Sequence, residues 1–147
     1  MLYLKHMEKI SGIKLKMTQI WKGNDVVPVS VIKISKKENL DFFKEGDLVK
    51  ITGVTKGHGF QGVVKRYSFA GGPKTHGQKN RYRAPGSIGA TAPQRVVPGM
   101  RMAGRMGADN KTIRNLKVVQ IDMEASTLLV RGSVPGNNRG KLVIQKA

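Results

Sequence analysis

Residues 116–131 of the sequence read LKVVQIDMEASTLLVR, and this stretch decides the fold class. Its two ends, 116–122 and 127–131, are rich in β-branched and aliphatic residues, which favour strands. The polar connection between them, from Asp122 to Leu128, is typical of a hairpin. We therefore expect two antiparallel core strands in this part of the chain.

Four further segments carry the same strand signals. Apolar residues alternate at period two from Ile13 to Trp21, which is the spacing of a half-buried strand. Residues 26–35, 48–54 and 142–145 are rich in β-branched residues and are bounded by Gly, Asn, Asp and Pro. Six short strands predict a mainly β fold, a small six-stranded barrel.

Three local features refine the expected barrel. Pro28 cannot donate a hydrogen bond to a neighbouring strand, so its own strand is expected at an edge of the sheet, or bulged there. Residues 39–45 are expected to form a helical turn. The Gly, Pro and Asn residues of the segment 132–140 predict a turn before the last strand.

Composition points to a polyanionic partner. The 147 residues carry 27 Lys and Arg against 9 Asp and Glu, and a net charge of +18 exceeds what solubility requires. No segment approaches the roughly 18 apolar residues of a membrane-spanning helix. Residues 1–10 lack the apolar core of a signal peptide, and the absence of cysteine excludes disulfides and thiolate zinc sites, so a cytosol-like setting is expected.

The charge is concentrated in the middle of the chain. Residues 56–117 hold 13 of the 27 basic residues and a single acid, Asp109, and residues 53–107 contain 12 of the 18 glycines. Such a segment buries little core of its own, so what it binds is expected to order it. We expect residues 1–55 and 118–147 to form the barrel domain, and residues 56–117 to form an inserted extension.

Residues 57–62 read GHGFQG, a literal G-x-G-x-x-G motif that follows a strand-like segment. A dinucleotide fingerprint opens a helix and is followed by an acid for the ribose, whereas residues 63–69 are expected to form a strand and residues 79–83 are basic. Two interpretations remain open. The glycines let backbone N–H groups approach a phosphate between Lys56 and Lys65, or they only permit tight turns.

Aromatic and basic side chains alternate in the middle segment, and both can stack on exposed RNA bases. Tyr82 lies between Arg81 and Arg83 and is the better stacking candidate. Phe60 and Phe69 are at least as well explained by packing against the barrel.

Enzymatic and metal-binding alternatives lack the residues that they need. His58 and His76 have no cluster of Asp, Glu or Cys beside them, so they are expected to bind RNA by hydrogen bonds or to lie on the surface. Ser68 and Ser87 have no supporting base and acid, so the sequence predicts no catalytic residue, cofactor or metal site. The basic region has no long recognition helix of a DNA reader, and an irregular arm suits a folded RNA.

The basic side chains of the middle segment are expected to contact phosphates, arginine in a bidentate manner. Methionines among them are expected to fill irregular gaps. The predicted RNA-binding residues are Lys56, His58, Lys65, Arg66, Lys74, His76, Lys79, Arg81, Tyr82, Arg83, Ser87, Arg95, Arg101, Arg105, Lys111 and Arg114.

Several ordered motifs resemble one known family. Residues 53–66, GVTKGHGFQGVVKR, look like the signature of the universal large-subunit ribosomal protein L-three family. Residues 69–73 (FAGGP), 75–77 (THG), 83–89 (RAPGSIG) and 128–136 (LLVRGSVPG) are similar to that family in order and spacing. The resemblance covers nearly the whole chain.

The resemblance implies a translation-factor-like barrel near the surface of the large ribosomal subunit, in the cytoplasm. It implies that the extension reaches through 23S-type ribosomal RNA toward the peptidyl transferase centre, and that the protein supports early subunit assembly. It also implies contacts with the neighbouring proteins L-fourteen and L-nineteen. The tip of the extension would comprise Ala90, Thr91, Ala92, Pro93, Gln94 and Arg95.

The sequence departs from the family pattern at three places. Lys16 stands where the family usually has glycine, a long strand-containing segment between Ile34 and Phe43 is cut to a short link, and the tip differs, so no glutamine methylation is predicted. Two other functions stay open at this point. One is a free-standing RNA chaperone or regulator, and the other is a nucleotide-dependent enzyme that uses residues 57–62.

Overall fold

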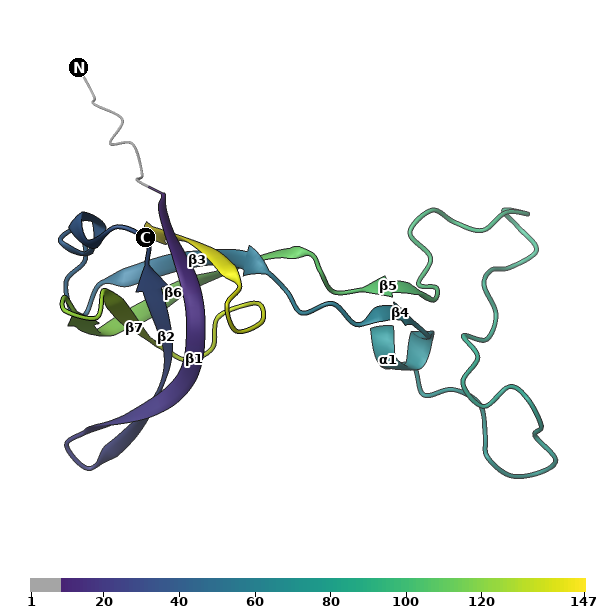
Figure 1. Ribbon diagram of the computed structural model, residues 1–147. Coiled ribbons are helices and arrows are strands. Elements are labelled where there is room, and N and C mark those ends of the chain that lie inside the picture. The colour runs from purple at the N-terminus through teal and green to yellow at the C-terminus, as the bar shows by residue number, and fades with distance from the viewer. Residues whose placement is uncertain (1–8) are drawn as a thin grey trace, which may run out of the picture. The chain divides into compact units, whose positions relative to one another are not determined.

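The computed structural model describes residues 9–147, so residues 1–8, where the sequence predicts no signal-peptide core, lie outside the described part. The chain divides into two compact units, residues 1–56 with 108–147 and residues 57–107. Within the described residues, the first unit contains six strands and a short 3-10 helix (Figure 1). The second contains two short strands and one short helix.

The strands of the first unit form a closed antiparallel barrel in the order β1–β2–β7–β6–β3–β8. The ring closes because β8 pairs with β3 on one side and with β1 on the other. Within the barrel wall each strand therefore pairs on both sides, without the free edges that open sheets expose. The six strands are β1 (Ile10–Lys22), β2 (Asp25–Ile34), β3 (Leu48–Val54), β6 (Asn110–Asp122), β7 (Thr127–Arg131) and β8 (Lys141–Lys146).

Alternating burial along the strands builds the barrel core. In β3 the residues Val49 and Ile51 are buried, and the residues between and beside them are more exposed. β-Branched side chains suit this pleated, half-buried surface. The largest fully buried side chains of the core also include Ile32, Ile34, Val118, Leu128, Val130, Leu142 and Ile144.

The predicted hairpin between β6 and β7 is present. Asp122 pairs with Thr127, and the Asp122 Oδ1 atom accepts hydrogen bonds from the backbone N–H groups of Glu124 and Ala125, each at 3.0 Å. A carboxylate that accepts bonds from the next residues is a local turn device, which is why this polar connection is short. All six predicted strands are confirmed.

The outer part of the β1–β2 hairpin forms a two-stranded ribbon, which we call the distal ribbon and define as residues 16–28. β1 pairs with β8 only through residues 10–13, and β2 pairs with β7 only through residues 29–33. Pro28 pairs with Gln19 and directly precedes the first β2–β7 pair, and its carbonyl oxygen accepts a hydrogen bond from the Gly132 backbone N–H at 2.8 Å, so it lies at the margin of the β2–β7 pairing and not on a free edge. Trp21 of this ribbon is 70% exposed.

The link between β2 and β3 closes one side of the core. Its helical turn is the 3-10 helix η1 (Lys37–Leu40), which begins before the predicted range 39–45 and overlaps it at two positions. Leu40 and Phe43 are both buried and belong to the core cluster of the barrel. The short link thus supplies apolar side chains to the core.

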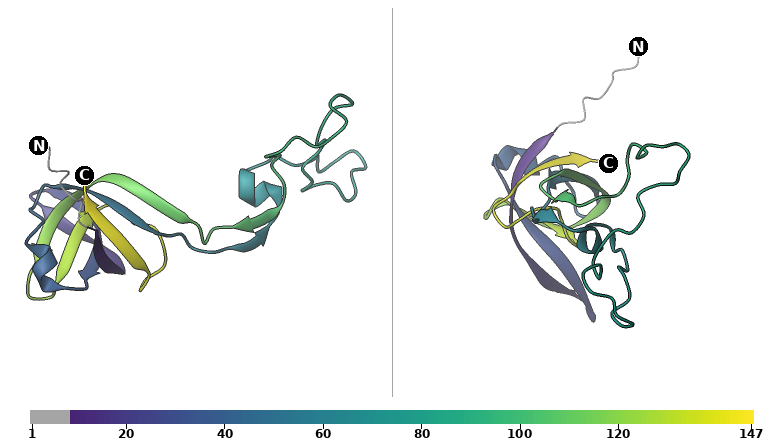
Figure 2. Two further views of the ribbon diagram at one scale, coloured as in Figure 1. Left: turned by 90° about the horizontal axis from the view of Figure 1, so that it is seen from above. Right: turned by 90° about the vertical axis from the view of Figure 1, so that its right-hand side faces the viewer.

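The second unit has little regular structure. Its elements are β4 (Gly59–Gln61), α1 (Val63–Tyr67) and β5 (Gly104–Met106), and β4 pairs with β5 in a two-stranded sheet. Residues 68–103 contain no helix or strand and run as open loops (Figure 2). Val63 is the one buried hydrophobic residue of this unit. None of the helices within residues 9–147 is long and apolar enough to cross a membrane.

Candidate nucleic-acid interface

The glycine motif at residues 57–62 lies mainly in the two-stranded antiparallel sheet formed by β4 and β5. Gly59 pairs with Met106, and the backbone N–H of His58 donates to the Met106 carbonyl oxygen at 2.9 Å. The Gln61 side-chain amide donates to the His58 carbonyl oxygen at 2.5 Å. Of the three glycines of the motif, Gly59 thus lies in the β4–β5 sheet and Gly62 directly follows β4.

The strand expected over residues 63–69 is wrong, because this segment begins with the helix α1. The β-branched residues Val63 and Val64 suggested a strand, but a single turn of helix forms and ends where Ser68 adopts a left-handed conformation with φ of 59°. The helix has five residues, and the glycine motif before it belongs to an antiparallel sheet. A dinucleotide site needs a parallel βαβ unit and a ribose-binding acid, so that interpretation still fails.

Arg66 joins α1 to the segment that precedes β5. Its Nη1 atom donates to the Met102 carbonyl oxygen at 2.7 Å, and its guanidinium lies 5.0 Å from the centre of the Tyr67 ring. A Cβ atom added at Gly104 would lie 2.6 Å from the same Nη1 atom, so glycine makes room for this contact. The sequence predicted Arg66 as an RNA ligand, and the structure gives it an intramolecular role as well.

Tyr67 is the centre of an aromatic and cationic cluster that the predicted residues only partly covered. Besides Arg66, the Arg101 guanidinium lies 5.8 Å from the Tyr67 ring centre. The Phe69 ring lies 6.1 Å away at an interplanar angle of 41°. Both distances fit favourable cation–π and aromatic contacts. In the sequence, the alternation of basic and aromatic residues at positions 65–69, KRYSF, is the pattern that indicates Tyr67.

The two phenylalanines differ in exposure. Phe60 is 76% exposed, whereas Phe69 is half-buried beside Tyr67 within the second unit. Tyr82 is 38% exposed, and its hydroxyl donates to the Gln78 carbonyl oxygen. The Tyr82 hydroxyl therefore stabilises its own loop. A ligand could contact Tyr82 only through the face of its ring.

The remaining predicted cations have no carboxylate partner among the described residues. Within residues 9–147, the one ion pair joins Lys146 to Asp47, and both of these residues lie outside the basic segment 56–117. Arginine and lysine exposed without carboxylates favour a polyanion. These exposed cations are Lys56, Lys65, Lys74, Lys79, Arg81, Arg83, Arg95, Arg101, Arg105, Lys111 and Arg114.

The structure separates the predicted site residues between the two units. Lys111 and Arg114 lie on β6, which begins at Asn110 rather than at 116, so they belong to the barrel unit together with Lys56. Thr112 of the same segment pairs with Thr52 through a hydrogen bond of 2.8 Å between their hydroxyl oxygens. This polar stretch lacks the apolar alternation by which the other strands were predicted.

The expected tip and the remaining polar candidates lie in the loops of the second unit. Residues 90–95 are exposed, and the Gln94 N–H closes a turn onto the Thr91 carbonyl oxygen at 3.0 Å. His76 is exposed with φ of 59°, and the Ser87 hydroxyl donates to the Gly89 carbonyl oxygen at 2.9 Å. Within residues 9–147 no three potential metal ligands come together.

Fold and charge together define a class: a small β-barrel protein that carries a glycine-rich, cation-rich unit. Comparison with known proteins makes this specific, since the family described as Ribosomal protein L3 matches residues 5–128. The chain belongs to this family of ribosomal proteins, which is not a family of enzymes.

Individual relatives agree with the family assignment. The large ribosomal subunit protein uL3 of Chloroherpeton thalassium is 57% identical over 144 residues, covering 96% of this chain and 67% of that protein. The uL3 protein of Herpetosiphon aurantiacus is 54% identical over 110 residues, covering 74% of this chain and 52% of that protein. The chain therefore spans about half to two thirds of the length of the relatives that it matches.

Proposed function

We propose that this chain is a structural component of the large ribosomal subunit and binds large-subunit ribosomal RNA. The observation that carries the proposal is the set of exposed cations without carboxylate partners in a unit with almost no core. A chain of this kind gains its order from a polyanion, and the counterions that it releases favour binding. The names of its relatives point to the same subunit.

Finer roles belong to the same proposal. The barrel unit is the stable part that carries the second unit, and the loops of residues 68–103 follow RNA, with residues 90–95 as the tip directed toward the peptidyl transferase centre. Early assembly of the subunit, location in the cytoplasmic ribosome, and contacts with proteins L14 and L19 follow from the resemblance to the family. The proposal assigns the chemistry of translation to the ribosome and no reaction to this chain.

Cofractionation tests the proposal. A tagged form of the chain, expressed in bacterial cells, is expected to remain with large subunits after a high-salt wash on a sucrose gradient. The variant Arg95→Gln/Arg101→Gln/Arg105→Gln, which removes three exposed cations of the second unit, is expected to lower this retention at least severalfold. Lys33→Gln/Lys36→Gln/Lys141→Gln removes three exposed cations of the barrel and is the matched control.

Two outcomes would contradict the proposal. A wild-type chain found only in the soluble fractions at the top of the gradient would contradict ribosomal incorporation. Equal retention of both triple variants would contradict the assignment of RNA binding to the second unit.

A further inference from the structure

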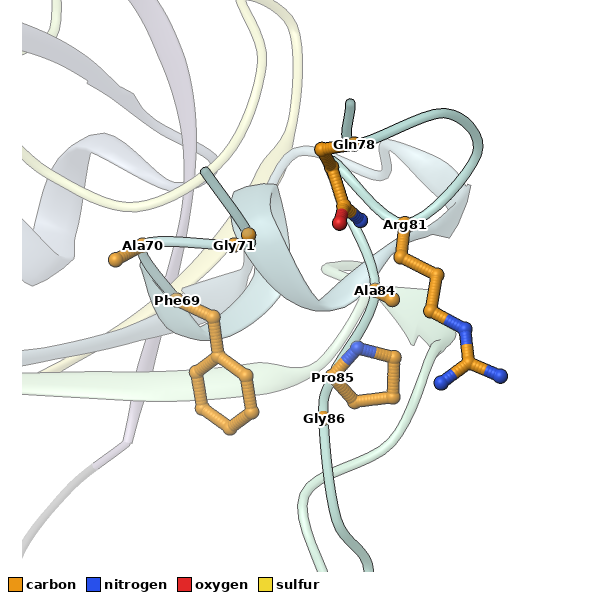
Figure 3. Close-up of a pocket in the computed structure, with 9 residues that line it drawn as sticks. Phe69, Ala70, Gly71, Gln78, Arg81, Ala84, Pro85 and Gly86 are labelled. Atoms are coloured by element: carbon orange, nitrogen blue, oxygen red, sulfur yellow. The ribbon is translucent and has the colours of Figure 1, made fainter. Parts of the chain in front are cut away.

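A pocket of about 450 Å³ lies in the loops of the second unit (Figure 3). This volume falls within the roughly 300–1,000 Å³ of typical small-ligand sites. We call it the loop pocket. It is lined by Phe69, Ala70, Gly71, Gly72, Gln78, Arg81, Ala84, Pro85 and Gly86.

Two glycines allow the chain to close around the loop pocket. The Gly72 N–H donates to the Tyr82 carbonyl oxygen at 2.9 Å, which joins residues 71–72 to residues 81–82. A Cβ atom added at Gly71 would lie 2.1 Å from that same oxygen, and one added at Gly72 would lie 2.7 Å from the Arg81 carbonyl oxygen. Any side chain at either position would force the two segments apart, so this framework requires glycine.

The walls of the loop pocket suit a flat, apolar group. The Phe69 ring is half-buried and is braced by Tyr67, whose ring centre lies 6.1 Å away. Figure 3 shows the Phe69 ring on one side of the pocket and Pro85 on the other, with Ala84 above it. The face of an aromatic ring in a pocket wall can stack with a planar ligand.

The polar groups of the loop pocket can recognise the polar edge of a planar ligand and a negatively charged group. Gln78 supplies a side-chain amide that both donates and accepts, and Figure 3 shows it at the rim beside Arg81. Arg81 is exposed, and no carboxylate lines the pocket. A guanidinium without an acid beside it favours an anion such as a phosphate.

We propose that the loop pocket receives a single unstacked base of an RNA strand. Phe69 stacks on the base, Gln78 bonds to its edge, and Arg81 contacts an adjacent phosphate. Sequence-tolerant recognition of RNA works by such stacking, because every base has a π-face. This inference rests on the proposed function and adds a defined base-binding site to the contacts with phosphates.

Short RNA hairpins with one bulged nucleotide provide the probe. Four hairpins differ only in the bulged base, and a fifth lacks the bulge. The dissociation constants of the full chain are measured by filter binding. The wild-type chain is expected to bind at least one bulged hairpin more tightly than the fully paired one.

Removal of the ring should abolish this preference. Phe69→Ala is expected to weaken binding to the bulged hairpin by about 5- to 100-fold, the range for loss of a stacking aromatic residue. Its binding to the paired hairpin should change by less than about twofold, since phosphate contacts persist. Phe42→Ala, which removes an exposed ring of the barrel unit, is the control and should alter neither constant.

Two further variants distinguish loss of base binding from local misfolding. Phe69→Tyr keeps the ring and should retain the preference for the bulged hairpin. Ala84→Leu leaves every proposed contact in place but fills the half-buried wall of the loop pocket, so it should lose the preference as Phe69→Ala does.

The possible failures are distinguishable. If wild type binds neither class of hairpin, the proposed RNA-binding function and this inference both fail. If wild type binds the two classes equally, or Phe69→Ala weakens both alike, RNA binding stands and the loop pocket is not a base site. Full competition by millimolar adenosine monophosphate would overturn an RNA strand as the source of the base.

Discussion

At the scale of single residues, Asp47 is a carboxylate that the fold holds by two hydrogen bonds to one oxygen. Its Oδ2 atom accepts hydrogen bonds from the Lys146 amine at 2.5 Å and from the Lys44 backbone N–H at 2.9 Å. These two bonds, the Lys146 bond foremost, lower the pKa of the Asp47 carboxyl below its ordinary value. The pair ties the start of β3 to the end of β8, where the barrel closes.

The stability that Asp47 contributes should depend on pH. A carboxyl whose pKa is lower in the folded chain stabilises the fold above its unfolded pKa of about 3.9, and this contribution is lost as pH falls through the folded pKa. Asp47→Asn should therefore reduce the free energy of unfolding at neutral pH by a few tenths to about 1 kcal/mol, because the pair is partly exposed to solvent. Urea unfolding at several pH values measures this.

The difference between wild type and Asp47→Asn should shrink below about pH 4. Asp25→Asn removes an exposed carboxylate of the distal ribbon and is the control. A wild-type advantage that persists unchanged into strong acid would show that the Lys146 contact does not stabilise the fold.

At the scale of elements, burial alternates along a strand, so that residues of the barrel core lie next to exposed neighbours. In β8, Ile144 is fully buried, whereas Val143 is 37% exposed. Ile144→Ala should lower the free energy of unfolding by about 2–5 kcal/mol, because it leaves a cavity among core side chains. Val143→Ala is the adjacent control and should cost well under half as much, as judged by urea unfolding of both variants. Equal losses would mean that the β8 register is different.

The same alternation explains how much could be predicted from the sequence. All six barrel strands were predicted, because each contains apolar residues at period two or a run of β-branched residues. The first part of β6 was missed because Asn110, Lys111 and Thr112 show no apolar face. The helix α1 was missed because its five residues are too few for a helical period and begin with two valines.

The candidate interface was predictable in composition but not in contacts. Lysines and arginines without nearby acids are visible in the sequence, so the exposed cations were found. The bond from Arg66 to the Met102 carbonyl joins residues 36 positions apart, and the Arg101–Tyr67 contact is similarly distant in sequence. Such contacts depend on which loop segments come to lie side by side. Glycine-rich loops have no sequence periodicity from which that arrangement could be predicted.

At the scale of the whole molecule, the chain combines a barrel stabilised by its apolar core with a unit that has one buried hydrophobic residue and many cations. If about half of the 13 basic residues in residues 56–117 meet phosphates, the log–log slope of RNA affinity against salt should be about −4 to −6. Filter binding to ribosomal RNA fragments over a range of KCl concentrations measures the slope. A slope near zero would show that these cations do not neutralise phosphates.

The distal ribbon determines how the tryptophan fluorescence of the chain responds to unfolding and to binding. Trp21 is the one tryptophan of the sequence and is 70% exposed, so its indole is in water while the barrel is folded. Its fluorescence maximum should therefore move little when urea unfolds the core, although the far-ultraviolet circular dichroism signal is lost. A shift to shorter wavelength would instead report that a ribosomal partner has covered the ribbon. This single indole is a built-in probe of docking at the barrel that is nearly silent to folding.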